Sequence, residues 1–430
     1  MQRVALPYGD ETVEVSLPDE LVVEYPEPQP TDAGPVGRPE ATALSEGAVI
    51  EAALDAPVGA PRLEDRARGA ARVTIVVPDG TRPARTPLTL EALLARLSSA
   101  GVSDTAITVL VGGGIHAPAT AADLASLVGE RVAARVRVLS SDAGDPSAFV
   151  GVPPDRVVPH PRLHRAIVET DLVVATGAVA PHYLAGWSGG AKALVPGCAD
   201  RETVEAVHRV TLDATVALDG SVRSLLGSTA PNAFRAAIER VARGAAPTWA
   251  FLPGISAGRL VHAHAGDLDA AHAAAVAEHR RRFACVRPEP ADLVIAGGGA
   301  PRDRDLLQAH KGLVVACDVA KRGAPVVWLA HAKDGAGHPR FLPWFEAGRL
   351  DRHLGALRRQ FHPYGLTAYA LRWKAARNPV HAVSTQSRDV LRPMGLHPFT
   401  NAQAAVDAAI ATYRPARCVV LPRALETFFA

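Results

Sequence analysis

The chain has 430 residues, of which 48% are hydrophobic and 21% are charged, and its formal net charge is +2. That length is more than one ordinary core needs, so we expect two domains, and the composition is typical of a soluble globular protein. A charge so close to zero, without a cluster of lysine and arginine, argues against a nucleic-acid partner. The longest apolar runs have the length of strands, so we expect no transmembrane helix, no signal peptide and no membrane partner.

The four cysteines are far apart in the sequence and form no Cys-x-x-Cys pair: they are Cys198, Cys285, Cys317 and Cys418. Such spacing indicates neither a zinc site nor a disulfide framework. We therefore expect a reducing, cytoplasmic location.

The first residues predict a hairpin followed by an exposed connection. Residues 1–25 alternate polar and apolar side chains as an edge hairpin does, and residues 25–40 are rich in proline, which favours extended backbone. Strands and helices then alternate, which predicts a mostly parallel sheet with helices on both faces. We expect strands at residues 71–79, 104–114, 136–143 and 171–180, and helices at residues 88–101 and 119–132.

A second α/β unit is expected from about residue 285, after a linking helix at residues 271–283. Residues 291–320 are typical of a strand, a glycine turn and a helix, and further strands and helices follow at residues 323–332, 366–377, 380–385, 401–413 and 416–422. The predicted fold is α/β with two domains, each a mostly parallel sheet flanked by helices. We expect an N-terminal domain at residues 1–280, a C-terminal domain at residues 285–400, and a helix and strand at residues 401–430 that pack back on the first domain.

Polar side chains with useful chemistry follow several predicted strands at their carboxyl ends. Open α/β sheets bind ligands at that edge, so these side chains predict a convergent cleft. They are Asp79, Thr81, Arg82, His116 and His182 in the first half of the chain, and Gln308 and Lys311 in the second.

The span from His182 to His208 combines two histidines with Lys192 and a Ser-Gly-Gly turn that contains Gly189 and Gly190. Glycine lets backbone approach a ligand closely, and a lysine in an otherwise apolar stretch needs a partner. A nucleophilic amine with imidazoles nearby is what a covalently anchored metal cofactor would need. Packing alone gives no reason for this assortment of residues.

Each pattern also has a plainer interpretation. The DGTRP segment with Arg82 is as readily an ordinary turn as a fork for a carboxylate or phosphate, and Lys192 could be an ordinary loop lysine. The glycine turn before His116 lacks a GxGxxG helix start, which disfavours an NAD dehydrogenase. Most of the 16 histidines must be structural or solvated, and beyond the residues above only His338 carries some weight as a residue that borders the cleft.

Seven blocks stand in a specific order over nearly the whole chain: LPYGDETVEV, LDAPVGAPRLEDRARG, DGTRP, GGGIHAP, HYLAGWSGGAKALVPG, His208 and LQAHKG. Together they resemble the nickel-dependent lactate racemase family. The resemblance implies a two-domain α/β fold whose N-terminal domain anchors the cofactor and whose active site lies in the interdomain cleft. It also implies a nickel-pincer nucleotide, the nickel complex of pyridinium-3,5-bisthiocarboxylic acid mononucleotide, which other proteins make and load.

The resemblance assigns a role to each residue type that the chain retains. Lys192 would bind the nucleotide covalently, with Asp79, Thr81, Gly189 and Gly190 around the cofactor, and His208 would ligate the nickel. His116 and His182 would be the two acid/base groups, and Arg82 and Lys311 would hold the oxygen atoms of the substrate. Gln308, Leu307 and Leu366 would line the substrate pocket.

The implied reaction is inversion of the hydroxyl-bearing carbon of a 2-hydroxy acid. Because the Cα–H of such an acid is poorly acidic, hydride transfer to and from the cofactor replaces proton abstraction, and the protein orients and polarises the substrate. Two aromatic residues of the lactate enzymes are absent, since Leu307 replaces a tyrosine and Leu366 aligns with a tryptophan. We therefore expect a substrate larger than lactate.

Two alternatives stay open at this point. The same cofactor could epimerise a secondary alcohol of a sugar or sugar acid. A cofactor-free α/β binding protein is the alternative from another class, and it predicts that substitution of His116 or His182 by alanine changes nothing measurable.

Overall fold

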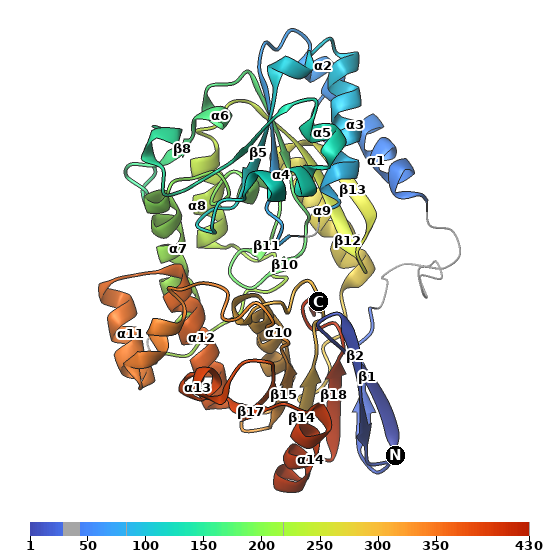
Figure 1. Cartoon of the computed structure of the whole chain (residues 1–430), viewed down its shortest axis with the longest axis vertical. Helices are drawn as coiled ribbons and strands as arrows, with labels where there is room; N and C mark the ends of the chain where they lie inside the picture. The colour runs from blue at the N-terminus through green and yellow to red at the C-terminus, as the bar shows by residue number, and fades with distance from the viewer. Residues whose placement is uncertain (29–43, 83, 218, 430) are drawn as a thin grey trace. The chain divides into compact units, whose positions relative to one another are not determined.

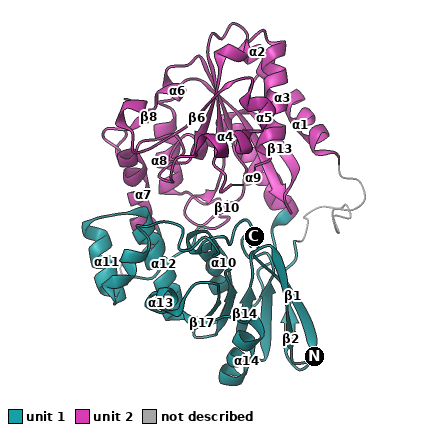
Figure 2. Cartoon of the chain, in the orientation of Figure 1, with its two compact units in different colours: residues 1–30, 215–225, 283–430 teal, residues 31–214, 226–282 magenta. Residues whose placement is uncertain are grey.

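The structure is a computed structural model that describes residues 1–28, 44–82, 84–217 and 219–429. The chain forms two compact units, which Figure 2 colours separately. Unit 2 comprises Thr31–Ala214 and Leu226–Arg282, and unit 1 comprises Met1–Pro30, Thr215–Leu225 and Phe283–Ala430.

Unit 2 is built on a six-stranded sheet in the order β13-β12-β9-β4-β5-β6 (Figure 1). All its pairings are parallel except that of β12 with β13. Residues 73–77 of β4 are all buried, as expected of a parallel strand that is covered on both faces. The strands are β4 (Val73–Pro78), β5 (Ile107–Gly112), β6 (Arg137–Ser140), β9 (Leu172–Thr176), β12 (Thr248–Ser256) and β13 (Arg259–Asp267).

Helices flank this sheet and share its hydrophobic core. Helix α3 buries Leu90, Leu93, Leu94 and Leu97, whose three- and four-residue spacing lines one helical face. It begins at Thr86 rather than at residue 88, because a proline is accepted in the first turn of a helix. The helices of this unit are α1 (Glu46–Asp55), α2 (Leu63–Ala67), α3 (Thr86–Ser99), α4 (Ala121–Val128), α5 (Glu130–Ala133), α6 (Arg165–Val168), α7 (Arg201–Thr215), α8 (Ala233–Ala242) and α9 (Leu268–Phe283).

Unit 1 has a second six-stranded sheet, in the order β17-β16-β15-β14-β18-β3, and every pairing in it is parallel. Its strands are β3 (Val22–Glu24), β14 (Leu293–Ala296), β15 (Val326–Leu329), β16 (Val380–Val383), β17 (His397–Phe399) and β18 (Arg417–Leu421). The helices around it are α10 (Leu306–Val319), α11 (Leu350–Arg359), α12 (Pro363–Arg377), α13 (Arg388–Leu391) and α14 (Ala402–Tyr413). The predicted α/β class, with largely parallel sheets flanked by helices, is therefore confirmed.

The division into units differs from the predicted domain boundaries at both ends of the chain. The expected hairpin forms as β1 (Gln2–Tyr8) and β2 (Glu11–Leu17), but its apolar face joins the core of the second sheet, and β3 pairs with β18. The first 30 residues therefore belong with the C-terminal part of the chain rather than with residues 31–280. Since β18 lies between β14 and β3, residues 401–430 complete the sheet of unit 1, where they pack on the first 30 residues of the predicted first domain.

Smaller differences concern where elements begin and end. The strand expected at residues 171–180 ends at Thr176, and β10 (Pro181–His182) pairs instead with β11 (Gly186–Trp187) in a short hairpin. A further two-stranded pair joins β7 (Phe149–Gly151) to β8 (Arg162–His164). Most of the proline-rich connection expected at residues 25–40 lies outside the described residues. In the described parts of the chain, no helix combines the length and the apolar character needed to cross a membrane.

We expect Gly197→Ala to destabilise unit 2. A Cβ at this position would lie 2.1 Å from the carbonyl oxygen of Ala193, and this backbone contact has no flexible side chain that could move away. Overpacking of this kind costs about 1–3 kcal/mol, so the melting temperature of a unit of this size should fall by about 2 °C or more. Gly151→Ala is the matched control, because its Cβ would meet no atom within 4 Å. Equal melting temperatures for the two variants would contradict the packing described for Gly197.

Candidate active site

Asp79 and His116 meet at the carboxyl ends of two neighbouring strands. Pro78 of β4 is in register with Gly112 of β5, so the loops that follow the two strands leave the sheet side by side. His116 Nδ1 lies 2.5 Å from Asp79 Oδ2, with the two side chains 27% and 16% exposed. The sequence placed both residues at strand ends, and the structure joins them directly.

Asp79 is held as a carboxylate by its neighbours. Burial alone would raise its pKa, but the hydrogen bond from His116, the nearby Arg82 charge and a hydrogen bond from Thr81 lower it to about 2. The Thr81 hydroxyl donates to Asp79 Oδ1 at 2.6 Å, and the Thr81 amide donates to the same atom at 3.2 Å. Asp79 can therefore fix the orientation of the His116 ring at neutral pH.

The glycine turn after β5 packs directly on the segment that follows Lys192. The Gly114 amide donates to the carbonyl of Gly197 at 3.0 Å. A Cβ on Gly112 would lie 3.0 Å from Cys198 Sγ and 3.2 Å from the Gly197 carbonyl, so this approach requires glycine. The contact brings the loop that carries His116 against the segment that carries Lys192.

Lys192 lies in a short 3₁₀ turn, η3 (Gly190–Ala193). Gly189, just before this turn, and Gly190, its first residue, both have positive φ angles. Arg235 Nη1 donates to the carbonyl of Gly189 at 3.1 Å, and His272 Nε2 lies 2.9 Å from the carbonyl of Ser188. A Cβ on Gly190 would come within 2.9 Å of both Arg235 and His272. The Ser-Gly-Gly turn is therefore required both by its backbone conformation and by the two side chains that hold it.

The Lys192 amine is chemically unusual. Burial and the positive charges of Arg82 and Arg235 lower its pKa to about 7, although Asp79 acts in the opposite direction. An ordinary lysine amine is almost fully protonated at neutral pH, whereas Lys192 is neutral in a large fraction of molecules. A neutral amine has a free electron pair, so the Lys192 amine can act as a nucleophile.

His208 uses one of its two ring nitrogens to hydrogen-bond its own helix. Its Nδ1 lies 2.7 Å from the carbonyl of Val204 in α7, and since a carbonyl can only accept, Nδ1 carries the proton. Nε2 then keeps its lone pair, which is the arrangement of a metal-binding histidine. The ring also packs against Phe234, with 4.8 Å between ring centroids. Among the described residues, no group of three or more His, Cys, Asp or Glu side chains could hold a metal ion.

His182 lies in β10 and has the opposite arrangement at Nδ1. The backbone amides of Leu184 and Ala185 both donate to this atom, at 3.2 and 3.1 Å. The ring is 9% exposed and stacks on Tyr183, with 5.3 Å between ring centroids. Its orientation is thus fixed from one side by backbone and from one face by an aromatic ring.

The other predicted residues lie in unit 1, on α10 and α12. The Lys311 amine donates to Gln308 Oε1 at 2.6 Å, and Asp305 caps the helix by accepting from the Gln308 amide. Leu307 is 7% exposed, and Leu366 is 2% exposed in the first turns of α12, which packs against α10. Their contact with a substrate, and the location of the site in the interdomain cleft, stay predictions.

Sequence reasoning missed residues that stabilise the site without standing at a strand end. Arg235 and His272 sit on ordinary helices, and nothing in their sequence context marks them. The rarity of lysine is one signal in the sequence that draws attention to Lys192. Only five of the 46 lysine and arginine residues are lysines, and Lys192 is the first of them in the chain. The signal is not specific, because Lys321 and Lys333 are exposed and form ordinary ion pairs with Asp292 and Asp10.

His338 lies near the predicted substrate residue Leu307. A Cβ on the neighbouring Gly337 would come 2.8 Å from Leu307 Cβ, and the His338 ring lies 4.3 Å from that of Tyr364. Tyr364 in turn contacts His362, with 5.2 Å between ring centroids. His338, Tyr364 and His362 therefore form a chain of ring contacts that begins one residue from the contact between Gly337 and Leu307.

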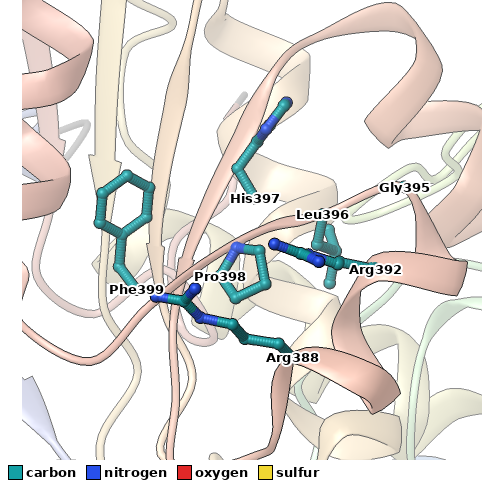
Figure 3. Close-up of a pocket in the computed structure, with 7 residues that line it drawn as sticks. All are labelled: Arg388, Arg392, Gly395, Leu396, His397, Pro398 and Phe399. Atoms are coloured by element: carbon teal, nitrogen blue, oxygen red, sulfur yellow. The ribbon is translucent and has the colours of Figure 1, made fainter.

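A pocket in unit 1 lies elsewhere and contains none of the predicted site residues (Figure 3). Arg388 and Arg392 line one side of it, and in Figure 3 the His397 side chain points away from both. It therefore does not mark the candidate site.

Comparison with known proteins identifies the family. Residues 8–219 match the family model described as the lactate racemase N-terminal domain. A lactate racemase of Lactiplantibacillus plantarum is 29% identical over 348 residues, which cover 79% of this chain and 77% of the relative. A lactate racemase of Thermoanaerobacterium thermosaccharolyticum is 28% identical over 356 residues, 81% of this chain and 79% of the relative. The chain belongs to the lactate racemase family.

Two solved structures share the fold of this lactate racemase family member. The lactate racemase apoprotein from T. thermosaccharolyticum has a TM-score of 0.86 at 23% identity, and all of both chains is covered. A protein from Thermotoga maritima has a TM-score of 0.71 at 17% identity, with 91% of this chain and all of that chain covered. At these identities the likeness establishes the fold.

The Lys192 amine can be measured directly because the chain has so few lysines. In apoprotein labelled with ¹³C and ¹⁵N only at lysine, we expect an amine signal that titrates near pH 7 and disappears in Lys192→Met. Arg82→Leu should raise this pKa, because it removes one of the two positive charges that disfavour the protonated amine. A Lys192 signal that titrates together with exposed Lys333 would contradict this electrostatic description.

Proposed function

We propose that this protein inverts the hydroxyl-bearing carbon of a 2-hydroxy acid, with a nickel-pincer nucleotide bound covalently to Lys192. Family membership supports an isomerase, because the relatives are named for the racemisation of lactate, which is a 2-hydroxy acid. The observation that carries the cofactor assignment is the buried Lys192 amine, with its pKa lowered to about 7, at the edge of a glycine turn.

The residues present fit such a group. Lys192 supplies an amine that can form a covalent bond at neutral pH, and Gly189 and Gly190 adopt the positive φ angles that its turn needs. His208 offers an unprotonated Nε2 as a nickel ligand, and the remaining ligands would come from the nucleotide itself. Asp79 and Thr81 would contribute polar groups beside the nucleotide.

The protein residues take different roles in the proposed reaction. When bound, the cofactor would supply the capacity for reversible hydride exchange with the substrate carbon. Arg82 and Lys311 would hold substrate oxygens, and Gln308 orients the Lys311 amine through the hydrogen bond at 2.6 Å. His116 and His182 would be the acid/base groups that take and return the hydroxyl proton. The reaction leaves no net oxidation, so no external nicotinamide is needed.

The cellular setting follows from the same chemistry. The nucleotide must be made and loaded by cofactor-biosynthesis proteins, so these are the protein partners that we propose. All four cysteines are free and buried, which supports a reducing, cytoplasmic location.

The substrate is larger than lactate in this proposal. Leu307 and Leu366 replace two aromatic rings that the lactate enzymes carry, which enlarges the space available to the substrate. A sugar or sugar acid is the second candidate. The contact between the His338 and Tyr364 rings, one residue from the approach of Gly337 to Leu307, favours it, because polar aromatic groups can hydrogen-bond extra hydroxyls.

Co-production with the cofactor-making enzymes tests the function. We expect the wild-type protein to carry nickel and a mass increment on Lys192, and to interconvert the enantiomers of at least one 2-hydroxy acid in chiral chromatography. In D₂O the product should keep its Cα hydrogen, since hydride transfer does not exchange that hydrogen with solvent.

Variants of the same protein locate the two attachments. Lys192→Arg should lose the mass increment, the nickel and the activity, whereas His208→Ala should keep the mass increment and lose most of the nickel. His160→Ala is the control, because His160 is exposed and should behave as wild type. Nickel-free wild-type protein without a mass increment, produced under these conditions, would exclude the proposal.

We expect Leu307→Tyr to shift the preference toward lactate. The added ring reduces the pocket volume, so kcat/KM for lactate should rise relative to that for larger 2-hydroxy acids by roughly tenfold, the size of effect that one pocket side chain supplies. Leu313→Val is the control, because it changes another buried leucine of α10 and adds no ring. A larger gain for the bulky substrates would show that Leu307 does not limit the pocket.

A further inference from the structure

Two arginines at the edge of the unit 1 sheet have no protein partner for their charge. Arg388 in α13 and Arg392, the first residue of the 3₁₀ turn η5 (Arg392–Met394), are both exposed and line the pocket in Figure 3. Among the residues that the structure describes, neither guanidinium forms an ion pair or a side-chain hydrogen bond, whereas exposed Arg304 pairs with Asp334. One pocket is therefore lined by two positive charges without a counterion.

The backbone places these two side chains on the same side of their segment. The Arg392 amide donates to the Arg388 carbonyl, which closes one α-helical turn and sets the two residues one above the other. Like charges at this spacing repel each other. Asp389 is the next residue after Arg388, and neighbours in the sequence do not face each other on a helix. An anion in the pocket would relieve the repulsion that Asp389 leaves in place.

The segment that carries the arginines is held by its contacts with α12 and with the core. Arg372 of α12 is 7% exposed, and its Nη2 donates to the carbonyl of Pro393 at 2.7 Å. Gly395 ends η5 with a φ angle of 86°, and its amide donates to the Arg392 carbonyl at 2.9 Å. Leu391, between the two arginines, is fully buried. A ligand would therefore have to order only the two arginine side chains, which lowers the entropic cost of binding.

The rest of the pocket is apolar and comes from β17 and the residue before it. Side chains alternate along a strand, and the rings of His397 and Phe399 both contact His381, with 5.6 and 5.1 Å between ring centroids. Pro398 therefore faces the other side of the sheet, and Figure 3 shows the His397 side chain pointing away from both arginines. Pro398 and Leu396 thus supply apolar surface beside the two charges.

Proline at this sheet edge disfavours an added strand as the occupant. β17 is the outermost strand of its sheet and pairs with β16. The Phe399 carbonyl accepts from the Ser384 amide at 3.2 Å, so Phe399 turns its backbone groups toward β16 and Pro398 turns its own toward the open edge. Proline has no N–H to offer there, and it protects edge strands from pairing. The pocket is therefore suited to a small anion rather than to an extended peptide.

The donors of the pocket match a phosphate group better than a carboxylate. Two guanidinium groups offer more N–H donors than the two oxygens of one carboxylate can use, whereas a phosphate ester has three free oxygens and close to two negative charges at neutral pH. The cavity volume of about 510 Å³ is in the range of small-molecule sites. It leaves space for an organic group next to the phosphate.

We propose that the pocket lined by α13, η5 and β17 is a binding site for a phosphate group, with one charge-assisted contact from Arg388 and one from Arg392. The phosphate is either free or carried by a small ester whose organic part contacts Leu396 and Pro398. The site lies within unit 1 and contains none of the residues assigned to the candidate active site. It is therefore independent of the proposed function.

Side-chain NMR of the purified full chain tests the site directly. With ¹⁵N-labelled arginine, the Nε–H signals of Arg388 and Arg392 are identified by their loss in Arg388→Gln and Arg392→Gln. When glycerol 3-phosphate is added at constant salt and slightly above neutral pH, we expect both signals to shift along one saturating curve. Arg352 is the internal control, because it is exposed and outside the pocket. Shifts at Arg388 and Arg392 that only parallel an unsaturated drift at Arg352 would overturn the proposal.

The same variants measure how much each arginine contributes. Arg388→Gln should weaken the binding observed at Arg392 about tenfold, the effect of one lost charge-assisted contact, and Arg392→Gln should weaken the binding observed at Arg388 equally. Arg352→Gln removes an exposed positive charge elsewhere in unit 1 and should leave the affinity unchanged. All three side chains are exposed, so the variants keep the fold. An unchanged affinity in both pocket variants would overturn the proposal.

Titrations with other anions identify the source of the phosphate. Glycerol 3-phosphate that binds more tightly than inorganic phosphate would support an ester whose organic part contacts Leu396 and Pro398. Inorganic phosphate that binds as tightly as the ester would support a site for free phosphate. Acetate that saturates the Arg388 and Arg392 signals at the same concentration as phosphate would overturn the proposal, because the site would then not distinguish a dianion from a single carboxylate.

Discussion

The close backbone contact between the glycine turn after β5 and the segment that ends η3 holds the candidate site of unit 2 together. The hydrogen bond from Gly114 to Gly197, and the approach of Gly112 to Cys198, leave no room for side chains at this junction. Because of that contact, a residue placed by a parallel strand and a residue placed by an irregular loop share one neighbourhood. The sheet alone would have positioned Asp79 and His116, but not Lys192.

Electrostatics in this neighbourhood serve reactivity rather than stability. The protonated form of Lys192 is unfavourable because the amine is buried next to Arg82 and Arg235. A large fraction of the Lys192 amines is therefore neutral at neutral pH. Asp79 has the opposite situation, since its carboxylate is stabilised by His116, Arg82 and Thr81. One small region thus holds a neutral lysine and a firmly ionised aspartate, which is the kind of separation that marks functional sites.

Much of this could be predicted from the sequence because local patterns decide it. The continuous apolar run of β4 and the leucine spacing of α3 are visible in the residues, and strand ends are where α/β sheets bind ligands. The assignment of the first 30 residues could not be predicted, because the pairing of β3 with β18 joins segments almost 400 residues apart. The supporting roles of Arg235 and His272 also depend on contacts that no local pattern encodes.

The unfavourable environment of the Lys192 amine has a consequence for the life of the protein before and after it is loaded. In the unfolded chain this amine has its ordinary pKa near 10, so between that value and about pH 7 the unfolded chain binds a proton that the folded apoprotein does not, and the apoprotein loses stability as the pH falls across this window. Covalent attachment converts the amine into a group that no longer titrates, and this penalty disappears. Maturation would then do more than supply a reactive group, because it would also remove a loss of stability that the empty chain carries in full at and below neutral pH.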